Sequence, residues 1–139
     1  MGALVYRVQD SEGRGPFRPG FSQRWSDLDF TPGMEQLPTI IEEFGRDIFQ
    51  RLGRPGEHYG TAVRDVDGLK RWFSPTERER LEKLNFRIVF LRVNRVLAES
   101  KNQLLFARTR PLRTGVAFIS WNAIKEASST PNQREVENV

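Results

Sequence analysis

Residues 101–112 have the sequence KNQLLFARTRPL, in which a polar turn leads into an apolar run and then into a basic turn. The apolar run predicts a buried strand from Gln103 to Ala107, because a short apolar segment between turn residues is typical of a sheet interior. Pro111 marks the second turn, and the residues beyond it predict a strand from Gly115 to Trp121. Upstream, apolar residues occupy both alternating sets of positions from Phe86 to Val93, which predicts a central strand with two covered faces.

The first half of the chain predicts the remaining strands and the helices. Leu4 to Val8 predicts a first strand, and Glu57 to Val63 predicts a second extended segment. Apolar residues at helical spacing predict a helix between Leu37 and Leu52, and Asp65 can cap a brief second helix. The run Ser74-Pro75-Thr76-Glu77 combines an N-cap serine, a proline at the first helical position and a capping glutamate, so a third helix is predicted to begin there.

The order strand, long loop, helices and consecutive strands predicts an α+β fold, with a small, mostly antiparallel sheet and about three helices in a single domain. We expect this domain to cover residues 1–121. Glycine and proline punctuate residues 10–38, which predicts a long loop. Residues 122–139 hold little apolar material, which predicts a disordered tail.

The composition excludes several kinds of site. The chain has no cysteine and a single histidine, His58, so it offers neither a disulfide framework nor a thiolate metal site, and we expect no metal site. No apolar segment reaches the length that crosses a membrane, and the N-terminus lacks the pattern of a secretion signal. We therefore expect a cytoplasmic protein without a membrane partner.

Positive charge is concentrated towards the C-terminus. Between Phe86 and Arg113 there are seven Lys and Arg residues against Glu99 alone, whereas the formal net charge of the whole chain is +4. Most of these cations are arginines, whose planar guanidinium makes two-pronged contacts to phosphate and carboxylate. Arg108, Arg110 and Arg113 lie in or beside the basic turn and are therefore candidates for binding an anionic partner. A solvated, charged sheet edge explains the same pattern equally well.

Two parts of the sequence resemble the ADP-ribosyltransferase-like domains. Tyr6-Arg7 resembles the aromatic-arginine pair in the first strand of that family, and the strand and basic turn from Gln103 to Pro111 resemble the region of its catalytic glutamate. The resemblance implies an enzyme that binds NAD and modifies a macromolecular acceptor. It implies that Arg7 contacts the NAD pyrophosphate, that Thr61 supports the nicotinamide ribose, that Gln103 is catalytic, and that Tyr6 and Tyr59 line the same cleft.

Gln103 departs from the pattern of that family, because an amide lacks the negative charge that stabilises a developing cation. The resemblance therefore implies either an active transferase or a degenerate relative that binds NAD without turnover. The alternative is a non-enzymatic accessory module of a phage or mobile element, which binds nucleic acid or an acidic protein through its arginine-rich sheet.

Overall fold

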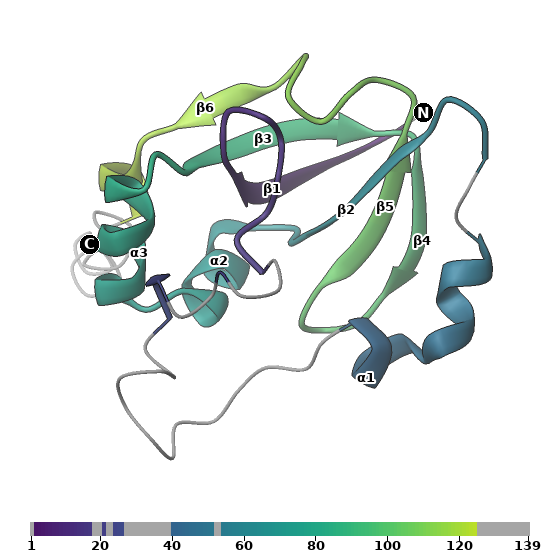
Figure 1. The fold of residues 1–139 in the computed structure, drawn as a ribbon, viewed down its shortest axis with the longest axis horizontal. Coiled ribbons are helices and arrows are strands. Elements are labelled where there is room, and N and C mark those ends of the chain that lie inside the picture. The colour runs from purple at the N-terminus through teal and green to yellow at the C-terminus, as the bar shows by residue number, and fades with distance from the viewer. Residues whose placement is uncertain (1, 18–20, 22–23, 27–39, 52–53, 125–139) are drawn as a thin grey trace, which may run out of the picture.

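The computed structural model describes residues 2–17, 21, 24–26, 40–51 and 54–124 (Figure 1). Its elements are, in chain order, β1 (Ala3–Gln9), α1 (Ile40–Phe44), the 3-10 helix η3 (Arg46–Arg51), β2 (His58–Ala62), α2 (Val66–Trp72), α3 (Pro75–Lys83), β3 (Arg87–Val93), β4 (Arg95–Glu99), β5 (Leu104–Arg108) and β6 (Ala117–Ile119). The predicted α+β class is confirmed. Much of the predicted loop, and the predicted tail from residue 125 onward, lie outside the described residues.

The strands form two small antiparallel sheets, where the sequence predicted one. β3 is the central strand of the first sheet, in the order β1-β3-β6, and β5 is the central strand of the second, in the order β2-β5-β4. One bridge joins the sheets, in which Tyr6 of β1 and Val63, next to β2, exchange backbone hydrogen bonds of 2.8 and 2.9 Å. Both central strands are apolar runs that the sequence identified, because a strand covered on two faces needs apolar residues at every position.

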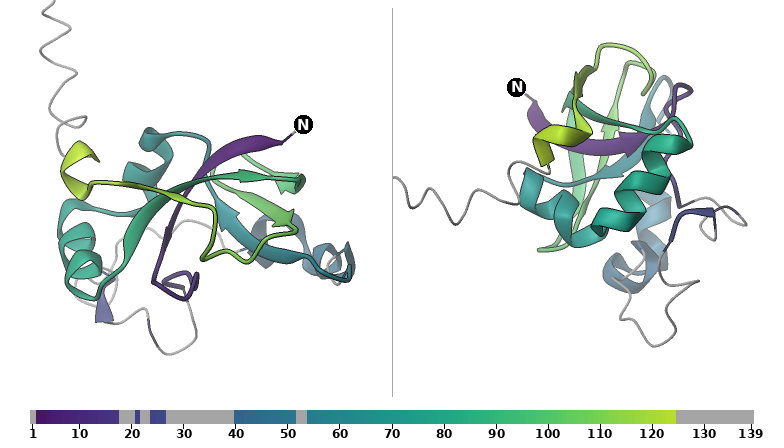
Figure 2. Two further views of the ribbon diagram at one scale, coloured as in Figure 1. Left: turned by 90° about the horizontal axis from the view of Figure 1, so that it is seen from above. Right: turned by 90° about the vertical axis from the view of Figure 1, so that its left-hand side faces the viewer.

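Three groups of buried apolar side chains hold these layers together. The side chains between the two sheets include Val5, Val89, Leu91, Leu104 and Phe106. A second group, on the outer face of the first sheet, includes Val8, Ile88, Leu69, Leu81 and Trp121 and lies against α2 and α3. A third group, on the outer face of the second sheet, joins Leu97, Leu105 and Ala107 to Ile48 of η3. Helices α2 and α3 therefore lie at one end of the molecule and α1 with η3 at the other (Figures 1 and 2).

The first predicted helix is interrupted at Gly45. This glycine has a φ of 85°, a left-handed conformation that ends an α-helix and that glycine adopts without a steric penalty. The chain continues as the 3-10 helix η3, and Ile48 on that helix is buried. The apolar spacing predicted the buried side correctly but did not reveal the break, because isolated glycines also occur inside continuous helices.

Strand β4 was not predicted. Residues 98–102 are mostly polar and indicate an interruption between strands, so no strand is expected there. The pairing of β4 with β5 shifts register between Val96 and Ala98, and such a bulge breaks the alternation of apolar and polar residues that reveals a strand. Leu97, at the bulge, is buried in the third group of apolar side chains.

The packed part of the chain continues beyond the predicted last strand. β6 is only three residues long, from Ala117 to Ile119. Residues 121–124 then form a helical turn in which Trp121 and Ile124 are buried, and the Trp121 indole N–H donates to the backbone carbonyl of Phe86 at 3.0 Å. These contacts anchor the end of the described chain to the first sheet.

Helix α3 begins with the capping box that the sequence predicted. The Ser74 hydroxyl accepts a hydrogen bond from the Glu77 N–H at 3.2 Å, and the Glu77 carboxylate accepts one from the Ser74 N–H at 2.9 Å. Pro75 occupies the first turn, where its missing N–H costs nothing. The helix covers the first sheet through Leu81, which is fully buried.

We predict that Ser74→Ala lowers the free energy of unfolding by about 1 kcal/mol, because an N–H at the start of α3 loses its acceptor. Ser74→Asp keeps an acceptor in place and should retain the stability of the native protein. Urea denaturation followed by circular dichroism measures both variants. Equal midpoints for Ser74→Ala and the native protein would show that the cap contributes nothing.

Candidate functional site

Arg7, predicted to contact a ligand, is buried among protein groups. Its Nε donates to the Gln9 Oε1 at 2.8 Å, and its two terminal nitrogens donate to the backbone carbonyls of Thr61 at 2.9 Å and Gly13 at 3.0 Å. Burial lowers the pKa of Arg7 to about 10, although the charge of Asp10 acts in the opposite direction. The guanidinium therefore connects β1 to β2 and to the turn after β1.

Close packing around Arg7 explains a glycine in β2. A Cβ added at Gly60 would lie 2.8 Å from a terminal nitrogen of Arg7, closer than non-bonded atoms approach. The absence of a side chain at Gly60 thus lets the guanidinium lie flat against the strand. This arrangement leaves Arg7 as a structural residue.

The other residues predicted to bind NAD do not come together in one site. The Tyr6 ring packs on Phe90 at a centroid distance of 4.8 Å and belongs to the group of apolar side chains beneath α2 and α3. Tyr59 belongs to the group beside η3, on the opposite side of the second sheet. Thr61 contributes its backbone carbonyl to Arg7. These residues lie in different layers of the molecule.

Gln103, predicted to be catalytic, anchors helix α1. Its side-chain amide donates to the Glu43 Oε1 at 2.9 Å, and the neighbouring Asn102 amide donates to the Glu43 Oε2 at 2.7 Å. Burial favours a raised pKa for the Glu43 carboxyl, but hydrogen bonds from Ser100, Gln103 and Asn102 and the charge of Arg71 outweigh it, so the pKa of Glu43 is lowered. Gln103 and Arg7 therefore have separate partners.

The turn between β4 and β5 also binds α2. Arg71 donates to the Lys101 carbonyl at 2.9 Å and to the Asn102 Oδ1 at 2.5 Å, and the Trp72 indole donates to the Asn102 carbonyl at 2.7 Å. Together with Glu43 these contacts fasten both α1 and α2 to one turn. The polar residues around Gln103 thus hold secondary structure together.

Arg108 differs from the other two arginines of the basic turn because it is buried, with 2% of its surface exposed. Its guanidinium donates to the backbone carbonyls of Arg110 at 3.1 Å, Pro111 at 2.5 Å and Thr114. Burial lowers the pKa of Arg108, and the charge of Arg110 lowers it further. Arg108 therefore stabilises the turn from inside and does not face a ligand.

Residues outside the basic turn also hold its backbone in place. The Gln9 amide donates to the Leu112 carbonyl at 2.8 Å, and the Asn94 side chain accepts from the Thr109 N–H at 2.8 Å. A Cβ added at Gly13 would lie 3.0 Å from the Arg113 backbone nitrogen, so the turn after β1 lies directly against the basic turn. These contacts fix the position of the backbone that carries Arg110 and Arg113.

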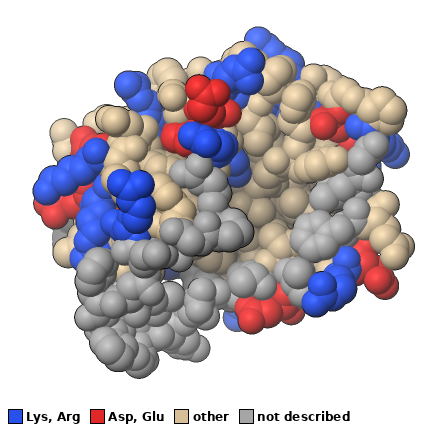
Figure 3. All heavy atoms as spheres, viewed as in Figure 1, with Lys and Arg blue, Asp and Glu red and all other residues tan. Residues whose placement is uncertain are grey.

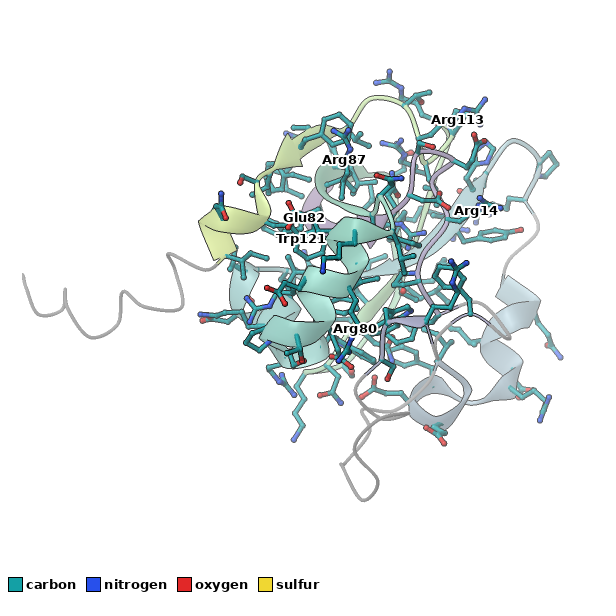
Figure 4. The ribbon with its side chains drawn as sticks, turned by 60° about the vertical axis from the view of Figure 1, so that its left-hand side comes forward. Arg14, Arg80, Glu82, Arg87, Arg113 and Trp121 are labelled. Carbon is teal, nitrogen blue, oxygen red and sulfur yellow. The ribbon has the colours of Figure 1, made fainter. Side chains whose placement is uncertain are left out.

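We call three of the exposed arginines on and beside this turn, Arg87, Arg110 and Arg113, the arginine face. Arg87 faces Gln9 across the β1–β3 pairing, and Gln9 in turn contacts the backbone beside Arg113. Figure 4 shows Arg87 and Arg113 on the upper side of the molecule, with Arg14 just below Arg113. The three members of the arginine face make no ion pair with any residue in the described ranges.

Other cations of the chain are neutralised by neighbours. Arg95 pairs with Glu57 at 2.9 Å, Arg64 with Glu99 at 2.7 Å, and Arg14 with Asp10 at 3.0 Å. Figure 3 shows acidic side chains beside many of the basic ones on the face drawn there. The positive charge that remains therefore lies mainly on cations that have no acidic partner in the described structure, and the arginine face is among them.

An exposed aromatic residue adjoins the arginine face. Phe118 of β6 is 61% exposed, and the Arg87 guanidinium lies over its ring at 4.9 Å from the centroid. Neither Arg87, one of the cations counted between Phe86 and Arg113, nor Phe118 was predicted to be a site residue. Phenylalanine in a predicted strand usually indicates a buried position, but β6 is the edge strand of its sheet, and Phe118 is left in solvent there.

Within the described residues, no group of three or more His, Asp or Glu residues lies close enough to hold a metal ion. No helix in this part of the structure has the length and apolar character needed to cross a membrane.

Comparison with known families identifies relatives of the chain. Residues 1–118 match the family described as Bacteriophage T4 Y00F protein. The chain belongs to the T4 Y00F family. The match spans the whole arginine face and ends at Phe118. No curated protein and no solved structure matches the chain.

Membership of the T4 Y00F family corrects the predicted resemblance to ADP-ribosyltransferase-like domains, which was wrong. The matching motifs were short, and two consecutive residues such as Tyr6 and Arg7 point to opposite faces of a strand. The roles that this resemblance implied for Arg7, Thr61 and Gln103 therefore lose their basis.

We predict that the attachment of α1 weakens in acid. Because the pKa of Glu43 is lowered from its ordinary value of 4.5, its carboxylate stabilises the fold above that value, and this contribution is lost as the pH falls through the folded-state pKa. Glu43→Gln should lower the unfolding free energy by about 1 kcal/mol at neutral pH. The difference from the native protein should shrink at about pH 3.

Chemical denaturation at the two pH values measures this effect. Glu79→Gln, on an exposed position of α3 with no hydrogen bond recorded in the described structure, is the matched control and should show no such dependence. A difference between native protein and Glu43→Gln that stays constant with pH would contradict the prediction.

We predict that Arg108→Met lowers the stability of the protein much more than Arg113→Met does. Arg108→Met removes the guanidinium donors from the part-buried backbone carbonyls of Arg110, Pro111 and Thr114 and should cost about 1 to 3 kcal/mol of stability. Arg113→Met removes an exposed side chain and should change stability by less than about 0.5 kcal/mol. Thermal and urea unfolding measure the stability of both variants. Equal stabilities would show that Arg108 does not hold the turn.

Proposed function

We propose that this T4 Y00F family protein is a nucleic-acid-binding protein, and that the arginine face contacts the phosphate backbone. The observation that carries the proposal is the position of three exposed arginines, free of ion pairs in the described structure, around one braced turn. Neutralising phosphates with such cations releases condensed counterions, which drives binding without sequence-specific contacts.

The hydrogen bonds that fix the backbone of the basic turn favour a binding role for its exposed arginines. Arg108, Gln9 and Asn94 hold the backbone of the turn through hydrogen bonds to it. A preorganised backbone reduces the entropy lost on binding, so more of the interaction energy appears as affinity. A charged edge that served only to prevent aggregation would not need this bracing.

Packing also orients one of the exposed side chains. A Cβ added at Gly115 would lie 2.5 Å from the Arg110 guanidinium carbon, so the Arg110 side chain lies directly on the backbone of Gly115. Gly115 also has a φ of 62°, a conformation that favours glycine. The contact limits the freedom of Arg110, as expected for a side chain that presents its donors in a fixed direction.

Nucleic acid fits this face better than an acidic protein does. The arginine face is accompanied by the exposed ring of Phe118, and arginines beside an exposed aromatic ring are typical of surfaces that bind nucleic acid. Nucleic acid supplies a flat base beside every phosphate, whereas the carboxylates of an acidic protein surface engage only the arginines. Failure to bind any nucleic acid would leave the acidic protein as the partner to test.

We predict that the triple variant Arg87→Glu, Arg110→Glu, Arg113→Glu loses nucleic-acid binding and remains folded, because all three side chains are exposed. Fluorescence anisotropy with a labelled oligonucleotide at several salt concentrations measures the affinity. Removing each phosphate contact should reduce the slope of log affinity against log salt by about 0.7 to 0.9.

A matched control separates local contacts from net charge. The triple variant Arg46→Glu, Arg54→Glu, Lys101→Glu changes the charge by the same amount at exposed positions outside the arginine face. This control variant should bind the oligonucleotide more tightly than the arginine-face variant does. Equal losses in the two triple variants, or no binding by the native protein at low salt, would refute the proposal.

A further inference from the structure

Phe118 is exposed for a reason that its place in the sheet makes clear. Within the described residues β6 pairs only with β3, which makes it an edge strand, and Phe118 lies opposite Val89. Val89 is buried between the two sheets, with 1% of its surface exposed, whereas 61% of Phe118 is exposed. The ring thus stands at the margin of the core, where the second sheet no longer covers the first.

One side of the Phe118 ring is already covered by a cation. The Arg87 guanidinium lies 4.9 Å from the ring centroid, within the range of an attractive cation–π contact. No aromatic contact involving Phe118 is recorded in the described structure. Since 61% of the residue remains exposed beside Arg87, its other side is accessible to a flat group from solution.

We propose that Phe118 stacks against an unpaired base, so that the arginine face selects single-stranded nucleic acid over duplex. This inference rests on the proposed nucleic-acid binding and adds the class of ligand. A base in a duplex is stacked between its neighbours and is not available to a ring on the protein surface, whereas a base in a single strand can turn onto it. Arg110 and Arg113 bind the adjoining phosphates.

Arg87 has two functions in this arrangement. Its guanidinium holds the ring from one side, and its charge adds to the attraction for the backbone of the bound strand. Base–aromatic stacking tolerates every base, because each has a flat π-face. The site should therefore discriminate strandedness and show little preference for sequence.

The test compares three ligands of equal length, namely a single-stranded oligonucleotide, the same strand made abasic, and the corresponding duplex. The abasic strand retains the phosphates but has no bases to stack. The native protein should bind the normal strand at least about fivefold more tightly than the abasic strand. Phe118→Ala and Phe118→Leu should lose this preference while their affinity for the abasic strand and the duplex stays unchanged.

Two controls complete the experiment. Phe17→Leu changes another exposed phenylalanine, which packs near Trp25 and Trp72 away from the arginine face, and it should retain the preference for the normal strand. Thermal unfolding verifies that the Phe118 variants are folded, as expected for a change at an exposed side chain.

The outcomes separate the two proposals. Loss of affinity by the Phe118 variants for all three ligands equally, or for none of them, would refute stacking and leave phosphate binding intact. Absence of binding by the native protein to any of the three at low salt would refute the proposed function itself. Normal binding with a preference for duplex would overturn the inference while confirming that the face binds nucleic acid.

Discussion

The buried guanidinium of Arg7 is the contact on which the arrangement of the two sheets and the basic turn depends. It makes no ion pair with a described carboxylate, and its partners are the Gln9 amide and the carbonyls of Gly13 and Thr61. A buried cation is tolerated only when hydrogen bonds replace much of its lost hydration. Through Gln9 the same network reaches Leu112, so β1, β2 and the basic turn share one polar centre.

Sequence reasoning predicted the local elements and could not predict their assembly. The strands from Phe86 and from Gln103 follow from apolar runs, and the start of α3 follows from Ser74 and Glu77, because each signal is contained in a few adjacent residues. The division into two sheets depends on pairings such as β1 with β3, whose partners are about eighty residues apart in the chain. No local pattern encodes such a pairing.

In the candidate site, too, the sequence does not reveal which individual side chains are buried by the assembled fold. Arg108, Arg110 and Arg113 have the same chemistry and lie close together in the sequence, yet only Arg108 is enclosed by the turn. Arg108 ends β5, a strand in which every residue is buried, whereas the apolar run that marks this strand in the sequence stops at Ala107. Phe118 had no sequence signal either, because its exposure depends on where the second sheet ends.

The enclosure of Arg108 also determines what the outside of the basic turn presents to solvent. The carbonyl oxygens of Arg110, Pro111 and Thr114 accept hydrogen bonds from Arg108, and that of Leu112 accepts one from Gln9. Their lone pairs are thereby directed towards interior donors. Backbone oxygens left facing outward would repel an approaching anion, so the buried arginine removes a source of negative potential from the surface that its exposed neighbours make positive.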